Sequence, residues 1–196
     1  MKSSLLLFCC LLGSFFQVKA QETTTAAPSI RPANFGFGIS LFDFTTASRI
    51  RQNSLSSIIN SKQGAKIDDM APGVSISYVK GIQPRLDFAA SFSYASGRVY
   101  LQQSPNTARS SSFVVADASV QAKLLPEGFF MNPFVSGGVG VTVTQGYYGA
   151  ILPLGAGFRF QITDEAAITL QSQYRVAVTE SAGYHFVHGI SIFGKL

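Results

Sequence analysis

Residues 114–124 read VVADASVQAKL, with an apolar residue at every even position and a polar residue at every odd position from Asp117 onward. This period of two is typical of a β-strand, because successive side chains of a strand point to opposite sides. The even side carries only Val, Ala and Leu, whereas the charged residues Asp117 and Lys123 share the odd side. Such a strand needs an apolar environment on one face and a polar environment on the other.

The same alternation recurs in seven further segments, with Gly, Ser, Thr and Gln between the apolar residues. These segments begin near Phe35, Val74, Leu86, Val135, Leu152, Ile168 and Phe186. Connections after the second, fourth and sixth strands are short to moderate. The first and third strands are followed by long connections, 44–71 and 95–111, and the fifth and seventh by brief polar loops. Short turns at one end and longer loops at the other are typical of outer-membrane barrels.

These observations predict an all-β fold, a closed eight-stranded antiparallel up-and-down transmembrane β-barrel. The apolar faces of the segments carry no Asp, Glu, Lys or Arg within their spans. In hydrocarbon every backbone donor and acceptor needs a partner, so the sheet must close on itself. A soluble sandwich or lipocalin-like barrel is the alternative, but its polar face would be rich in Lys and Glu. We also expect two aromatic belts. The loop-end belt would contain Tyr94, Phe113, Tyr147, Tyr148, Tyr184 and Phe186, and the turn-end belt Phe129, Phe130 and Phe134.

The composition agrees with a chain that does not rely on a charged surface. Of 196 residues, 46% are hydrophobic and 13% are charged, about half the usual charged share of a soluble domain. This hydrophobicity excludes a disordered chain, and the absence of a basic stripe interleaved with aromatics excludes nucleic acid as a partner. The uncharged run 128–158 resembles a transmembrane helix by hydropathy, but its eight glycines and two prolines favour two strands and a turn.

The beginning of the chain has the features of a secretory signal peptide. Lys2 precedes the apolar run 5–12, and Val18 and Ala20 supply short residues before a cleavage point. Lipidation is disfavoured, because a bulky Phe8 precedes the first cysteine. The predicted segments are a signal peptide over 1–20, a flexible leader over 21–33 and the barrel over 34–196. Both cysteines would leave with the signal, and the net charge would fall from +5 to +3.

Besides Lys123, four charged residues fall on the polar faces of the strands. They are Asp87, Asp117, Arg159 and Arg175, which form the predicted lumen cluster. Side chains just fill the interior of an eight-stranded barrel, and unpaired charges there would be costly. We therefore predict that this lumen charge cluster forms a neutralised polar plug. A proton or ion path through the same residues is the alternative.

No catalytic, cofactor-binding or metal-binding residues are predicted. Asp68 and Asp69 lack the surrounding ligand spacing of a cation site, and His185 and His188 are expected to be interfacial residues near the outer rim. One open alternative is an outer-membrane lipid acyltransferase that combines His185 with Asp43 and the serines of 110–112.

A second open alternative is passage of small apolar solutes through a laterally opening wall. Pro72 and Pro153 are expected at the outer ends of the second and sixth strands, where a missing backbone donor could loosen the sheet.

Several segments resemble known barrel strands. These are APGVSISYVKGIQPRLDFAASFSY (71–94), MNPFVSGGVGV (131–141), LPLGAGFRF (152–160) and HGISIFGKL (188–196). They resemble the small outer-membrane β-barrel proteins of Gram-negative bacteria, of the Bacteroidetes-type family, an OmpA-, OmpX- or OmpW-like barrel without a peptidoglycan-binding domain. One departure is the terminal Leu196, since such barrels commonly end in an aromatic residue.

The resemblance implies an integral, non-enzymatic protein of the outer membrane without cofactors. It would act structurally or through surface contacts made by the loops 44–71 and 95–111. Within the first loop, the residues SLSSIIN (54–60) themselves predict a short helical turn over the barrel mouth. The implied partners are outer-membrane lipids, the outer-membrane assembly machinery, and an extracellular ligand or partner membrane protein.

Overall fold

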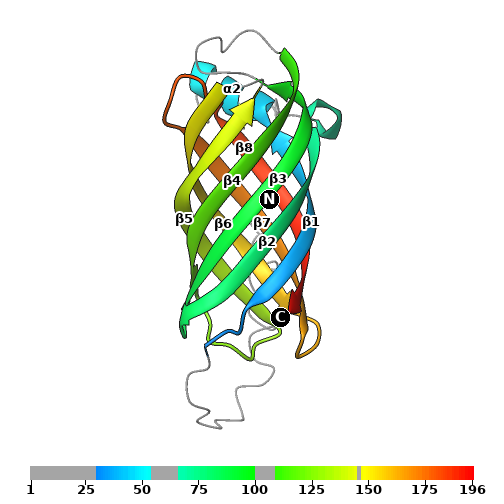
Figure 1. Ribbon diagram of the computed structural model, residues 1–196, viewed down its shortest axis with the longest axis vertical. Coiled ribbons are helices and arrows are strands. Elements are labelled where there is room, and N and C mark those ends of the chain that lie inside the picture. Colours follow the sequence, from blue (N-terminus) through cyan, green and yellow to red (C-terminus); the bar gives the residue numbers. More distant parts are fainter. Residues whose placement is uncertain (1–29, 54–65, 100–108, 145–146) are drawn as a thin grey trace, which may run out of the picture.

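The structure, a computed structural model, describes residues 30–53, 66–99, 109–144 and 147–196. Eight strands follow one another along the chain and close into a barrel, each antiparallel to its neighbours (Figure 1). They are β1 (Asn34–Asp43), β2 (Ala71–Gln83), β3 (Leu86–Val99), β4 (Arg109–Lys123), β5 (Met131–Thr144), β6 (Tyr147–Gln161), β7 (Ala166–Ala177) and β8 (His185–Lys195). Pairing of β1 with both β2 and β8 closes the sheet. The prediction of a closed eight-stranded antiparallel up-and-down barrel is confirmed. The expected signal peptide lies outside the described residues.

The strand register sets the width of the barrel. The shear number of the barrel is the offset along β1 after one circuit of paired residues. A circuit that starts at Asp43 passes through β8, β7 and the following strands to Lys80 of β2. Lys80 is level with residue 33 on β1, so the shear number is ten. With the usual rise and spacing of strands, this shear gives a tilt of about 40° and a Cα radius of about 8 Å. A bore of that width is filled by the side chains that point into it.

Inward and outward faces follow the predicted alternation. On the outer face Ile39, Val139 and Ile192 are 65%, 62% and 63% exposed, whereas Asp87 on the inner face is fully buried. The aromatic belts differ in part from expectation. Tyr147 and Phe130 are exposed, but Phe113 and Phe134 are buried inside the barrel. Both share the parity of the lumen residues, so their large rings fill the bore near its ends.

The loop end is covered by a helix, α2 (Phe44–Asn53), at the top of Figure 1. Asp43 precedes it and accepts a hydrogen bond from the Thr46 backbone N–H at 2.8 Å, which is the geometry of an N-cap. The helical turn expected at 54–60 lies outside the described residues. A short 3-10 helix, η1 (Ile67–Asp69), leads into β2. Within the described ranges, no helix is long and apolar enough to cross a membrane.

The predicted limits of the loop 95–111 are wrong at both ends, because its first and last residues belong to strands. Ala95 pairs with Phe113 and Gly97 with Ser111, so β3 and β4 extend as a hairpin beyond the neighbouring strands. The small serine and glycine residues there have the composition of a loop, but the backbone ladder continues through them.

At the turn end, the last residues of the predicted leader are joined to the barrel. The Gly81 N–H donates to the Arg31 carbonyl at 3.1 Å, and the Leu196 N–H donates to the Ala33 carbonyl at 3.0 Å. The β4–β5 turn depends on Gly128, whose φ of 101° favours glycine. This turn and the incoming chain position charged side chains at the mouth of the lumen.

Candidate functional site

Asp87 is the centre of an ion-pair network at the turn end of the lumen. Its carboxylate lies 3.1 Å from Arg31 Nε, 2.8 Å from Lys123 Nζ and 3.4 Å from Arg159 Nη1. Asp87 is fully buried and the three cations are at most 7% exposed. We call these four residues and Glu127 the turn-end cluster. Burial of one carboxylate among three cations fixes the side chains that fill this end of the barrel.

Glu127 completes the cluster from the β4–β5 turn. It accepts two hydrogen bonds from Arg31 Nη2, at 3.0 and 2.9 Å, and another from Lys123 Nζ. Burial raises the pKa of Glu127, but the Lys123 hydrogen bond and the charges of Arg31 and Lys123 outweigh it, so the pKa lies below its ordinary value. The carboxylate is therefore held in its ionised form.

Asp117 and Arg175 form a second ion pair, the middle pair, nearer the loop end. Arg175 Nη2 donates to Asp117 Oδ2 at 2.7 Å, and Ser91 donates to the same oxygen at 2.9 Å. The Arg175 guanidinium also lies 5.6 Å from the centre of the Phe42 ring. A cation over an aromatic face is stabilised by the ring quadrupole.

The structure thus arranges the four predicted lumen residues as two pairs, Asp87 with Arg159 and Asp117 with Arg175. Sequence reasoning missed three further members. Lys123 had the correct parity in the strand pattern. Arg31 and Glu127 come from the leader and a turn, where no periodicity marks the inward direction. Together the site holds four cations and three carboxylates, a net charge of +1.

Between the turn-end cluster and the middle pair lies a cavity of about 20 Å³. It is lined by polar side chains such as Ser77, Ser91 and Thr169. A space of this size holds about one water molecule. Above the middle pair, apolar side chains close the bore beneath α2, and the Phe42 and Phe113 rings meet edge to face at 5.1 Å. The lumen is therefore filled from the turn-end cluster to the apolar side chains under α2.

His185 lies inside the barrel under α2 and not at an open rim. Its ring stacks on Phe44 at 4.4 Å, and Nδ1 lies 2.8 Å from the Gly183 carbonyl. The other ring nitrogen, Nε2, is buried without a hydrogen-bond partner. Neither nitrogen bonds Asp43, which caps α2, and Ser112 is bonded to Tyr94 and Ser96 on the outer wall. His185, Asp43 and Ser112 are therefore not assembled into a catalytic geometry.

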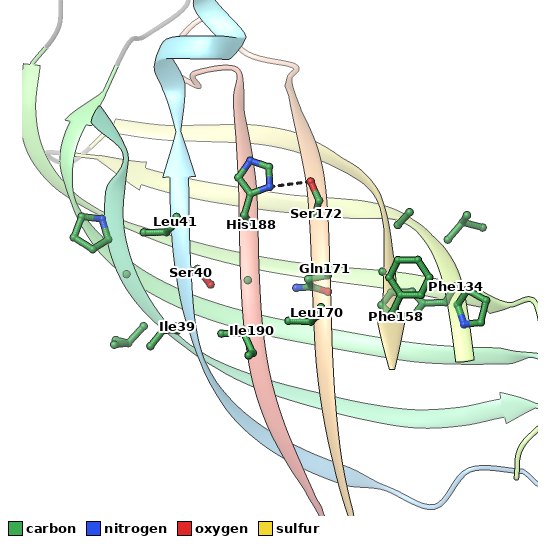
Figure 2. Close-up of a pocket in the computed structure, with 18 of the residues that line it drawn as sticks. Ile39, Ser40, Leu41, Phe134, Phe158, Leu170, Gln171, Ser172, His188 and Ile190 are labelled. Carbon is green, nitrogen blue, oxygen red and sulfur yellow. Dashed lines mark hydrogen bonds between the residues drawn. The ribbon is translucent and has the colours of Figure 1, made fainter. Parts of the chain in front are cut away.

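The outer wall carries a polar pair that sequence reasoning did not predict. His188 Nδ1 lies 3.0 Å from Ser172 Oγ across the β7–β8 ladder, among apolar neighbours (Figure 2). The expectation of a rim position for His188 is wrong. Its partner Ser172 is six residues from the turn end of β7 and five from the loop end, and is therefore at mid-depth. We call Ser172 and His188 the wall pair.

Within the described segments, no group of three or more His, Cys, Asp or Glu could hold a metal ion. Asp68 and Asp69 lie on the exposed η1 turn at the loop end.

No protein-family model matches the sequence, and no curated protein matches it. Similar solved structures include Neisserial surface protein A, with 10% identity, 84% coverage of this chain, 96% coverage of that chain and a TM-score of 0.51. Another is the N-terminal β-barrel domain of OprF from Pseudomonas aeruginosa, with 10% identity, 86% and 100% coverage, and a TM-score of 0.51. At this identity the likeness concerns the fold alone. The chain has the closed eight-stranded fold of these outer-membrane barrels.

Proposed function

We propose that the chain is a non-enzymatic integral outer-membrane protein of a Gram-negative bacterium, with a filled lumen and a structural or surface-contact role. One observation carries this proposal. Exposed apolar side chains surround the closed barrel, while the strand charges lie inside it or at its two ends. A charge on the lipid face at mid-depth would cost about 2–4 kcal/mol. This distribution suits a barrel whose outer wall is in hydrocarbon.

The filled lumen supports a role other than bulk transport. The turn-end cluster, the middle pair and the apolar side chains under α2 occupy successive levels of the bore, and the intervening cavity measures only about 20 Å³. An open aqueous path through the barrel would require at least one of these levels to rearrange. The proposal therefore includes a structural role for the lumen charges.

The surface-contact role belongs to the loop end. In outer-membrane barrels the longer loops face outward and the short turns face the periplasm. Here α2, η1 and the paired ends of β3 and β4 lie at one end, opposite the turns and residue 196 (Figure 1). The proposed partners are outer-membrane lipids, the assembly machinery, and an extracellular ligand or membrane protein. The finer assignment to the Bacteroidetes-type barrels belongs to this proposal and is supported by the strand segments of the sequence.

Fractionation and conductance test the proposal together. We expect the processed chain in outer membranes, released by detergent and not by osmotic shock, with an epitope tag in 54–65 accessible on intact cells. In planar bilayers the purified barrel should show no large, steady conductance. Release by osmotic shock would overturn the membrane assignment, and a stable pore would overturn the filled lumen.

A break in the sheet favours lateral passage of small apolar solutes as a second candidate. The β5–β6 pairing is interrupted between Gly137–Leu154 and Gly140–Ile151, at the level of Pro153. Proline lacks the N–H that a ladder needs. Pro153 was expected at the outer end of the sixth strand, and this expectation is wrong, because Pro153 lies within β6. Uptake of an apolar solute that is lost on deletion of the gene and reduced when Pro153 is replaced by Ala would support this candidate.

A further inference from the structure

The wall pair is a polar feature in the middle of an apolar surface. Ser172 is exposed and His188 is partly exposed. Their outward neighbours on the same ladders, Leu170 and Ile190, are 41% and 40% exposed and apolar. Figure 2 shows both polar side chains on adjacent strands, with Leu170 and Ile190 nearer the turn end. Apart from tyrosines such as Tyr78, the other outward polar side chains of the described strands lie near the ends of the barrel, at Lys80, Ser96 and Ser112.

The internal hydrogen bond uses only half of the hydrogen-bonding capacity of the wall pair. If Ser172 donates to Nδ1, then His188 Nε2 carries a hydrogen and Ser172 Oγ keeps free acceptor lone pairs. In the other tautomer His188 Nδ1 donates, so Nε2 is an acceptor and the Ser172 hydroxyl remains a donor. Either way the pair presents one donor and one acceptor. At mid-depth in a bilayer, neither water nor lipid ester groups are available to satisfy them.

A two-fold axis through this surface satisfies both groups at once. An isologous contact places the same patch of two subunits face to face, so the donor of each copy meets the acceptor of the other. The surface also permits close approach. Ala156, the neighbour of Ser172 on β6, is small, and small residues beside polar ones are typical of contacts between membrane-spanning segments. Phe186 stacks parallel to the His188 ring at 6.2 Å and limits its orientation.

We propose that the β7–β8 wall, centred on Ser172 and His188, binds a second copy of this chain side by side in the membrane. This inference rests on the proposed membrane-spanning function. The self-complementary donor and acceptor select an identical partner, because a lipid chain offers neither group. The lumen and the loops are not part of the contact.

Site-directed cross-linking tests the interface. The only two cysteines, Cys9 and Cys10, lie in the predicted signal peptide, so a cysteine placed on the wall is the only thiol of the exported chain. Ile190→Cys lies beside the wall pair, and Ala118→Cys is the matched control on the outward face of β4, across the barrel. In native membranes and in phosphatidylcholine vesicles, a short bismaleimide should link Ile190→Cys into dimers and leave Ala118→Cys monomeric.

His188→Leu and Ser172→Ala separate an interaction role from a structural one. Each removes a polar group from the lipid face, so the monomer should fold and insert at least as well as the parent chain, while dimerisation in vesicles should weaken about tenfold. A dimer that is unaffected by both substitutions would overturn the inference. It would also be overturned by an inserted monomer carrying a bound lipid on this face, or by equal cross-linking at both cysteines. Failure of the parent chain to insert would instead contradict the proposed membrane function, so the two failures are distinguishable.

Discussion

Replacing Asp87 by Asn tests whether the lumen charges hold the barrel together. The substitution preserves the shape of the side chain but removes the charge that faces Arg31, Lys123 and Arg159 at 3.1, 2.8 and 3.4 Å. Glu127 still partners Arg31 and Lys123. Arg159 is left with only neutral partners, the Gln121 amide oxygen and the Thr169 hydroxyl. The change therefore leaves one buried cation, Arg159, without a charged partner.

Removing one partner of a buried ion pair costs about 3–5 kcal/mol, because the other charge stays desolvated. We expect Asp87→Asn to lower the free energy of unfolding by about 3 kcal/mol, the lower end, since two of the three cations keep a carboxylate. Adding Arg159→Met removes the stranded charge while keeping most of its volume. The double variant should recover more than half of the loss.

Urea unfolding in lipid vesicles at neutral pH measures these effects. The sequence has no Trp, so the folded fraction is best followed by the mobility shift of the intact barrel on unheated gels. Asp164→Asn, at an exposed turn position of the same end, is the control and should stay within about 0.5 kcal/mol of the parent chain. A loss below about 1 kcal/mol for Asp87→Asn would refute the reasoning and would mean that water solvates the cluster. A double variant no more stable than Asp87→Asn would refute the explanation that the unpaired charge of Arg159 causes the loss of stability.

Three further predictions concern the rest of the lumen. Arg175→Met should cost about 3 kcal/mol in the same unfolding assay, because Asp117 keeps only the Ser91 hydroxyl as a donor. The lowered pKa of Glu127 stabilises the fold at pH values above the ordinary glutamate pKa, and this contribution disappears as the pH falls through the lowered value. Acid titration should therefore destabilise the parent chain more than Glu127→Gln. Gly138→Ala should reduce the folded yield, since its Cβ would lie 2.1 Å from a carbonyl oxygen of β4, whereas Gly194→Ala meets nothing within 4 Å and should fold normally.

The fold was predictable because each strand has a polar side that is buried in the lumen and an apolar outer side. The alternation of polar and apolar residues therefore indicates which side chains point inward. The ends of the elements were not predictable in this way. The serines before Phe113 have the composition of a loop, yet Ser111 and Ser112 pair with β3. Helix α2 has little apolar periodicity, and its clearest local signal is the N-cap Asp43. Strand ends depend on which backbone lies alongside, and local composition does not record that.

The candidate site was predictable to the same extent. Parity assigned Asp87, Asp117, Arg159 and Arg175 to the interior, and the opposite signs suggested pairing. The choice of partners depends on the tilt of the strands, which brings residues from distant strands to the same level of the bore. Other cluster members, such as Arg31, enter from outside the strands and were identifiable only once the chain path was known.

The register between β7 and β8 determines both the depth of the wall pair in the barrel wall and whether its two side chains can form a hydrogen bond. Parity alone places Ser172 and His188 on the outer face, but a shift of two residues between β7 and β8 would keep both outward and separate them. In the observed register they face each other at 3.0 Å, at mid-depth. Their internal hydrogen bond lowers the cost of two polar groups in hydrocarbon without removing it, because one donor and one acceptor remain free. The remaining desolvation cost favours association with a second barrel, which supplies the missing hydrogen-bond partners. Replacing either residue by an apolar one should lower this cost in the monomer and so weaken dimerisation.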